Sequence, residues 1–180
     1  TITGTYTGSV NYNTSVSAAV GHTLNEADTS ATMTTPAGSV TYTFGQVFTL
    51  SAKVSVLPCG QSGPWGPPPG KLRFTFSPVV NFNGQPYLEA DVAGDTASAT
   101  IPIQDYPNAG VYSVTATYQG DGNFNASAAS AARMITIIAA TTTTAVSTSL
   151  SPSVYGQAVD FVVTVSVVQP GSIIPGTSDP

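Results

Sequence analysis

Val111-Tyr-Ser-Val-Thr-Ala-Thr-Tyr118-Gln-Gly-Asp-Gly-Asn-Phe-Asn-Ala-Ser127 has the clearest secondary-structure pattern in the chain. In its first half, Tyr112, Val114, Ala116 and Tyr118 alternate with serine and threonine. An alternation of period two is typical of a half-buried β-strand. The glycine, aspartate and asparagine residues that follow favour a tight turn. The stretch therefore predicts a strand, a turn and the start of a returning strand.

A similar pattern occurs near the start of the chain, at Ile2-Thr-Gly-Thr-Tyr-Thr-Gly8-Ser-Val-Asn-Tyr-Asn-Thr-Ser15. Gly8 and Gly120 lie about 112 residues apart, and segments 43–56 and 154–167 match at nearly the same spacing. A repeat of this length predicts modules in tandem. The 180 residues would hold the last strands of one module at 1–24, a complete module at 25–138 and the first strands of another at 139–180.

The complete module shows β patterns throughout and no convincing helical period. Val47–Val56 alternates, which places Lys53 on the outer side of a strand. The proline- and glycine-rich segment Leu57–Gly70 predicts a long loop, because proline removes a donor from the strand ladder. Short strands with frequent turn signals are typical of a β-sandwich. Further expected elements are a split first strand at 29–34 and 39–44, a hairpin around 93–95, and a last strand at 128–138.

Tyr112 has the spacing of a tyrosine corner, a feature of immunoglobulin domains. In that motif the tyrosine lies two residues before the second disulfide cysteine. Val114 occupies the cysteine position here, and Cys59 is the only cysteine, so an internal disulfide is excluded. The expected fold is all-β, with immunoglobulin-like β-sandwich modules in tandem and no disulfide. The alternative for Tyr112 is an ordinary inward-facing aromatic residue.

The composition favours a location outside the cell. Hydrophobic residues make up 41% of the chain and charged residues 7%, compared with roughly 25% charged residues in ordinary soluble domains. A surface of hydroxyl and amide groups is typical of secreted and cell-surface β-proteins. Four basic residues against nine acidic ones leave no basic patch for a nucleic-acid partner. No apolar run approaches the ~20 residues of a membrane-spanning helix.

Three stretches together resemble the bacterial Ig-like domain repeats of large secreted and surface proteins. They are Thr115–Phe124, the threonine run 141–144, and Ser151-Pro-Ser-Val-Tyr-Gly-Gln157. The resemblance extends over all three pieces of the chain. It implies a spacer or an adhesin stalk that has no catalytic residues to carry over. The chain departs from the family pattern in its long loop Cys59-Gly-Gln-Ser-Gly-Pro-Trp65-Gly-Pro-Pro-Pro69.

The turn after Tyr118 contains two candidate sites. Asp121, Asn123 and Asn125 place oxygen ligands at alternate positions, as calcium loops do. A β-turn closed by its own side chains is the favoured alternative, because the first copy of the turn has no acidic residue. Asn13-Thr-Ser15 and Asn125-Ala-Ser127 are also acceptor sequences for glycosylation, at equivalent positions of the two copies. A repeat produces this equivalence by descent alone, so unmodified asparagines are the favoured alternative.

Two functions remain. The first is a structural, non-catalytic segment of an extracellular stalk, adhesin or filament, with neighbouring repeats as partners. The second is a glycan- or protein-binding module that uses the Cys59–Pro69 loop, where Trp65 would stack on a sugar ring or anchor a partner. An equally favoured alternative is that Trp65 folds back over the end of the sandwich. No nucleophile–base pair or metal-ligand cluster indicates an enzyme or a cofactor.

The two incomplete modules predict unpaired strand edges at both ends of the chain. Residues 1–24 and 139–180 each supply only part of a sandwich and leave strand edges unpaired. This predicts either a piece of a longer protein, which is the preferred interpretation, or pairing with copies of the same chain.

Overall fold

The computed structural model describes residues 1–57 and 68–173 and contains a central sandwich of two β-sheets. The all-β prediction is confirmed, since the described helix content is one 3₁₀ turn at Ile103–Asp105. One sheet has three strands in the order β3 (Thr29–Thr35), β5 (Thr49–Val56), β8 (Thr96–Thr100). The other has five, in the order β4 (Val40–Thr43), β10 (Arg133–Ile138), β9 (Gly110–Tyr118), β6 (Lys71–Ser77), β7 (Leu88–Asp91).

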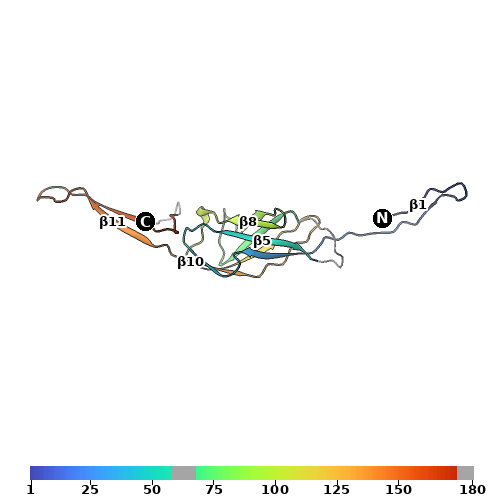
Figure 1. Ribbon diagram of the computed structural model, residues 1–180, viewed down its shortest axis with the longest axis horizontal. Coiled ribbons are helices and arrows are strands. Elements are labelled where there is room, and N and C mark those ends of the chain that lie inside the picture. The colour runs from blue at the N-terminus through green and yellow to red at the C-terminus, as the bar shows by residue number, and fades with distance from the viewer. Residues whose placement is uncertain (58–67, 174–180) are drawn as a thin grey trace.

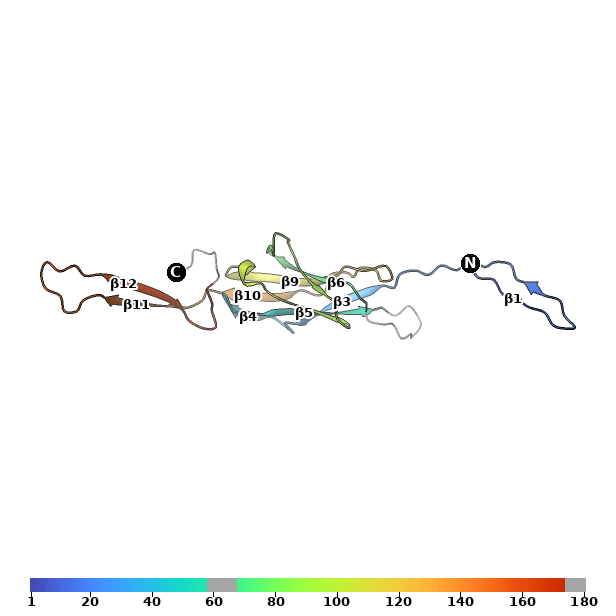
Figure 2. The ribbon, with the colours of Figure 1, turned by 90° about the horizontal axis from the view of Figure 1, so that it is seen from above.

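A hairpin projects from each end of the sandwich, so the molecule is long and narrow (Figures 1 and 2). The hairpin at the N-terminal side is formed by β1 (Thr5–Tyr6) and β2 (Ser15–Val16). The hairpin at the C-terminal side is formed by β11 (Thr142–Thr148) and β12 (Phe161–Val167). The chain enters the sandwich from one hairpin and leaves it toward the other at the opposite end.

The core lies between the two sheets and follows the predicted alternation. Large side chains with essentially no exposure come from both sheets, namely Leu50, Val54, Leu72, Phe74, Val114, Tyr118, Ile135 and Ile137. Burial of each such side chain contributes about 1.5–3 kcal/mol, so a module of this size is held by its core without a disulfide.

The outer faces of the sheets are lined by hydroxyl groups that pair across neighbouring strands. Ser51 and Ser98 lie 2.7 Å apart, oxygen to oxygen, and Thr75 and Thr115 lie 3.0 Å apart. Lys53 faces outward as predicted. Its Nζ lies 2.8 Å from the Asp95 carboxylate, and both side chains are about half exposed.

The first strand is split, as predicted, and its two parts belong to different sheets. β3 pairs antiparallel with β5 in the three-stranded sheet. After residues 36–39 the chain continues as β4, which pairs parallel with β10 in the five-stranded sheet. The first strand therefore connects the two sheets at the edge of the sandwich.

The prediction of a hairpin around residues 93–95 is correct for the turn and wrong for the strands on either side of it. Ala93 and Thr96 exchange two backbone hydrogen bonds of 2.9 and 3.3 Å, which closes the turn. The flanking strands then separate, because β7 pairs with β6 and β8 pairs with β5. The turn therefore carries the chain from one sheet to the other.

The last strand is shorter than predicted and begins at Arg133 instead of residue 128. Two serine side chains explain the difference. The hydroxyl of Ser130 accepts a hydrogen bond from the backbone N–H of Ala116, and that of Ser127 accepts one from the N–H of Tyr118, both at 3.0 Å. Each hydroxyl takes the place of a backbone carbonyl as acceptor, so this part of β9 bonds to the returning chain without a regular ladder.

Candidate functional site

Cys59 and Trp65, the residues of the predicted binding loop, lie outside the described residues. The structure describes the end of that loop, where Pro68 is buried. The carbonyl of Pro69 accepts a hydrogen bond from the hydroxyl of Tyr118, whose side chain is fully buried in the core. The loop therefore returns to the sandwich at the end that also holds the turn after β9.

That turn, at residues 121–125, is held by a side chain of its own and by the neighbouring residues Asp28 and Thr29. The Asp121 carboxylate accepts a hydrogen bond of 3.0 Å from the N–H of Asn123. The Asn125 side-chain amide donates to the Asp28 carboxylate at 2.9 Å, and the Asn125 carbonyl accepts from the Thr29 hydroxyl at 2.7 Å. This is the arrangement expected of a structural turn. Calcium binding by Asp121, Asn123 and Asn125 stays a prediction.

The two glycosylation sequences occupy different surroundings. Asn13 lies exposed in the hairpin at the N-terminal side. Asn125 is half-buried and bonded to Asp28, and Ser127 of the same sequence is buried against β9. A transferase would reach Asn13 more easily than Asn125 in the folded chain, while modification of either residue stays a prediction.

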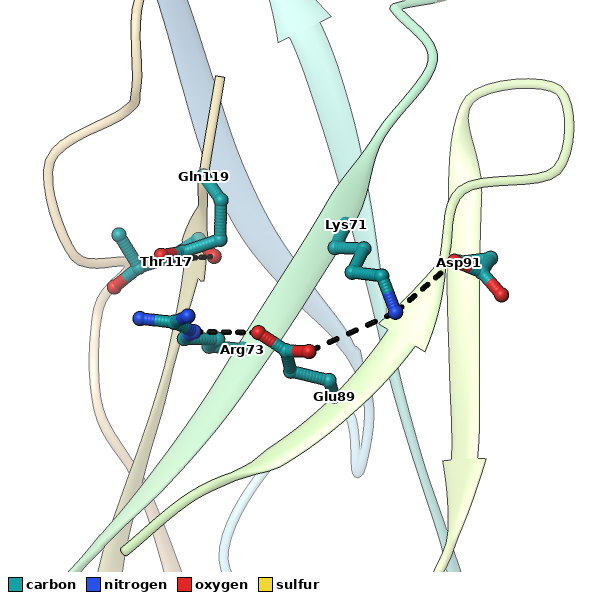
Figure 3. A network of polar contacts seen from close by, with 6 residues as sticks. All are labelled: Lys71, Arg73, Glu89, Asp91, Thr117 and Gln119. Atoms are coloured by element: carbon teal, nitrogen blue, oxygen red, sulfur yellow. Dashed lines mark hydrogen bonds and ion pairs between the residues drawn. The ribbon is translucent and has the colours of Figure 1, made fainter. Parts of the chain in front are cut away.

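The densest group of charges lies on the outer face of β6 and β7 and was not predicted from the sequence (Figure 3). We call it the polar network; its residues are Lys71, Arg73, Tyr87, Glu89, Asp91, Thr117 and Gln119. Strand register places Arg73 opposite Glu89 and Lys71 opposite Asp91. The sequence does show two basic residues at 71 and 73 and two acidic residues at 89 and 91, each pair spaced so that both side chains lie on one face of a strand. This spacing indicates a shared group of charges only once β6 and β7 are known to pair.

The four charged members of the polar network neutralise one another. Arg73 Nε donates to Glu89 Oε1 at 2.6 Å, and the Arg73 guanidinium stacks 4.2 Å above the centre of the Tyr87 ring. Lys71 Nζ lies 3.7 Å from Glu89 Oε2 and 3.5 Å from Asp91 Oδ1. The hydrogen bond to Glu89 raises the pKa of Arg73 above its ordinary value.

The polar network lies at the edge of the five-stranded sheet. β7 is the edge strand of its sheet. Charged side chains on an edge strand hinder pairing with other chains. Two positive and two negative side chains also leave the network without net charge. The network therefore places charged side chains where they hinder the pairing of this sheet edge with another chain.

The predicted tyrosine corner is confirmed. The hydroxyl of Tyr112 donates a hydrogen bond of 3.0 Å to the carbonyl of Asn108, four residues earlier. Beside it lies a hollow of about 270 Å³, whose lining includes Asp105 and Tyr106. The Asp105 carboxylate accepts a hydrogen bond of 2.8 Å from the N–H of Asn83. The hollow thus carries an acid that is already engaged in holding a neighbouring turn.

The sandwich and the segment that follows the hairpin at the C-terminal side touch closely at Gly45 and Ser172. Gly45 has a φ of +81°, and a side chain there would lie 2.6 Å from the backbone nitrogen of Ser172. Ser172 N–H donates to the Phe44 carbonyl at 3.4 Å. An apolar hollow of about 240 Å³ lies beside this contact, lined by Phe44, Ala109, Ala139, Ala140, Thr142, Val167 and Ser172.

Within the part of the chain that the structure describes, we found neither a metal-binding group nor a membrane-spanning helix. No three His, Cys, Asp or Glu side chains there lie close enough to hold a metal ion. None of the described helices is long and apolar enough to cross a membrane.

The chain matches a protein-family model over most of its central part. Residues 32–137 match the family model described as the bacterial Ig-like domain (group 3). The matched residues cover more than half of the chain and nearly all of the central sandwich. The comparisons with curated proteins and with solved structures each found no match.

Proposed function

The chain belongs to the bacterial Ig-like domain family (group 3), and we propose from this membership that it is a structural, non-catalytic segment of an extracellular stalk, adhesin or filament. Family members often occur in extracellular or surface proteins. The observation that carries the proposal is the path of the chain, which enters the sandwich at one end and leaves at the other. Modules connected in this way extend a protein in one direction.

The short connections between the parts also support a stalk. β10 ends at Ile138 and β11 begins at Thr142, so few residues are free to move between the sandwich and the next strand. At the other end, Ala27 exchanges two backbone hydrogen bonds of 2.9 Å with Asn123 and Asn125. Short, bonded connections limit the motion of one part relative to the next.

Tandem modules are part of the proposal, and the hairpin at the N-terminal side supports them. Its Ser17 hydroxyl accepts from the N–H of Gly4 at 2.9 Å, as the Ser130 hydroxyl accepts from Ala116 at 3.0 Å in the sandwich. The turn glycines Gly8 and Gly120 have φ angles of +80° and +78°. A hairpin with the same unusual serine bond is expected from a second copy of the same module.

The hairpin at the C-terminal side supports the tandem arrangement independently. Val167 pairs with Thr142 there, as Val56 pairs with Thr29 at the start of β3. The side-chain oxygen of Gln157 accepts from the N–H of Val154 at 2.9 Å. The side-chain oxygen of Gln46 accepts from the N–H of Thr43 at 3.0 Å in the same way.

A binding experiment tests the structural proposal against the alternative, a glycan- or protein-binding module that uses the Cys59–Pro69 loop. The 180-residue chain and its Trp65→Ala and Cys59→Ala variants are applied to a glycan array, and thermal unfolding of each is measured. We expect no glycan signal above background for any of the three. A signal that disappears in Trp65→Ala while the melting temperature is unchanged would replace the structural proposal with the binding one.

A further inference from the structure

The first and last strands of the sandwich run side by side in the same direction. Residues 27 and 30 form parallel bridges with 124 and 128. Farther along, β4 pairs parallel with β10, from the Val40–Ile135 pair to the Thr43–Ile138 pair. We call these paired segments, 27–30 and 40–44 against 123–128 and 135–138, the terminal seam.

Hydrogen bonds join the terminal seam at both of its ends. At the entry, Ala27 N–H donates to the Asn123 carbonyl, and Asn125 N–H donates to the Ala27 carbonyl, both at 2.9 Å. The Thr29 hydroxyl adds its bond of 2.7 Å to Asn125. At the exit, Phe44 N–H donates to the Ile138 carbonyl at 2.8 Å.

The seam also rests on the core. Ile135 and Ile137 of β10 are buried, with exposed fractions of 0% and 2%. On the β4 side, the Tyr42 ring stacks on Phe48 with 4.2 Å between ring centres. Sliding β4 along β10 would therefore disturb apolar packing as well as hydrogen bonds.

The direction of a pull on the two ends of the module follows from this geometry. The chain reaches the seam from one end of the sandwich and leaves it at the other (Figures 1 and 2). Tension on both connections therefore pulls the two strands past each other along their length. The hydrogen bonds of a parallel pair are evenly spaced, so sliding strains many of them together, whereas peeling breaks them one after another.

We propose that the terminal seam is a mechanical clamp that keeps the module folded when the chain is under tension. That the module experiences tension depends on the proposed function, since an extracellular stalk or adhesin carries force between its ends. The resistance itself rests only on the parallel pairing and on the opposite positions of entry and exit.

Single-molecule pulling in two directions tests the clamp. The 180-residue chain is first stretched through its two ends. We expect one abrupt step that releases about 110 residues of chain, at ~3.3–3.6 Å per residue. A chain carrying Cys59→Ser, Ser39→Cys and Ala132→Cys is then pulled through positions 39 and 132, which are exposed and lie at the same end of the β4–β10 pair. This geometry peels the pair, and we expect a several-fold lower force. Equal forces in the two directions would overturn the clamp.

Matched variants test the contribution of the seam itself. Thr29→Val removes the hydroxyl bond at the entry of the seam, and Thr75→Val removes a hydroxyl bond between β6 and β9, away from it. Chemical denaturation gives the equilibrium effect of each variant. We expect end-to-end pulling to show a lower unfolding force for Thr29→Val and an unchanged force for Thr75→Val. Equal force losses, or no loss for Thr29→Val, would overturn the clamp.

The clamp and the proposed function can fail separately. A high end-to-end force in a protein later found to be a compact glycan-binding molecule would keep the clamp and remove the stalk. An elongated chain whose end-to-end force is no higher than its peeling force would keep the stalk and remove the clamp.

Discussion

Tyr112 links a sequence spacing to an observed bond. Its distance from Val114 in the sequence predicted the corner, and the hydroxyl does bond to Asn108. Tyr106 is the opposite case. Its hydroxyl donates to the carbonyl of Gln46 at 2.7 Å, across a separation of 60 residues that no local pattern reveals. Local spacing thus finds contacts within a turn, whereas contacts between strands require the topology.

Replacing Tyr112 with phenylalanine tests the corner. We expect Tyr112→Phe to lower the free energy of unfolding by about 1 kcal/mol, the usual net value of one such hydrogen bond. Urea denaturation measures it. Tyr155→Phe is the control, because Tyr155 is fully exposed and its hydroxyl should contribute nothing. Equal stability of Tyr112→Phe and the unmodified protein would show that the corner does not stabilise the module.

Tyr106 should make the module sensitive to alkaline pH. Burial, with a smaller contribution from the charge of Tyr42, raises the pKa of Tyr106 to about 12. The tyrosine of the unfolded chain ionises near pH 10. The unfolded state therefore binds fewer protons between these values, and the free energy of unfolding falls as pH rises from 10 to 12.

Denaturation curves measured across that pH range test this dependence. The contribution of Tyr106 is complete below pH 10 and has a slope of at most about 1.4 kcal/mol per pH unit. Tyr106→Phe should flatten the slope without removing it, because burial also raises the pKa values of Tyr42, Tyr112 and Tyr118. An unchanged slope in Tyr106→Phe would contradict the assignment.

At the scale of elements, the alternation of β5 and β9 was enough to predict their strands and their buried faces. Alternation could not predict that β7 and β8 separate into different sheets, because both sides of a tight turn look alike in sequence. It also could not predict that Ser127 and Ser130 replace the start of the last strand. The polar network was missed for a related reason, since its four charges come from two strands whose pairing is not local.

The serine bonds at the edge of β9 should stabilise the module. Ser130→Ala leaves the buried N–H of Ala116 without its acceptor, which costs about 1–3 kcal/mol. Ser17→Ala removes the corresponding bond to Gly4 in the exposed hairpin, where water can replace it. Urea denaturation of the sandwich should therefore respond to Ser130→Ala and not to Ser17→Ala. Similar losses in both variants would contradict this account of β9.

At the scale of the whole molecule, the close approach of Ser172 to Gly45 should hold the hairpin at the C-terminal side in place. Gly45→Ala introduces a side chain against that backbone. Gly156→Ala is the control, because Gly156 has a similar φ of +91° and an added side chain there would meet nothing within 4 Å. Electron paramagnetic resonance between spin labels at positions 32 and 147, in a Cys59→Ser chain, measures the arrangement. We expect Gly45→Ala to shift or broaden the distance distribution and Gly156→Ala to leave it unchanged. Identical distributions in the two variants would mean that the contact does not set the arrangement.

Small-angle X-ray scattering of the 180-residue protein tests whether this chain is an in-line structural module. A compact domain of this length has a radius of gyration of ~16 Å. We expect a radius of gyration well above that value, with an asymmetric distance distribution in which one compact sandwich supplies the short distances. A radius near ~16 Å with a symmetric distribution would mean that the hairpins fold back onto the sandwich, and it would rule out an in-line module.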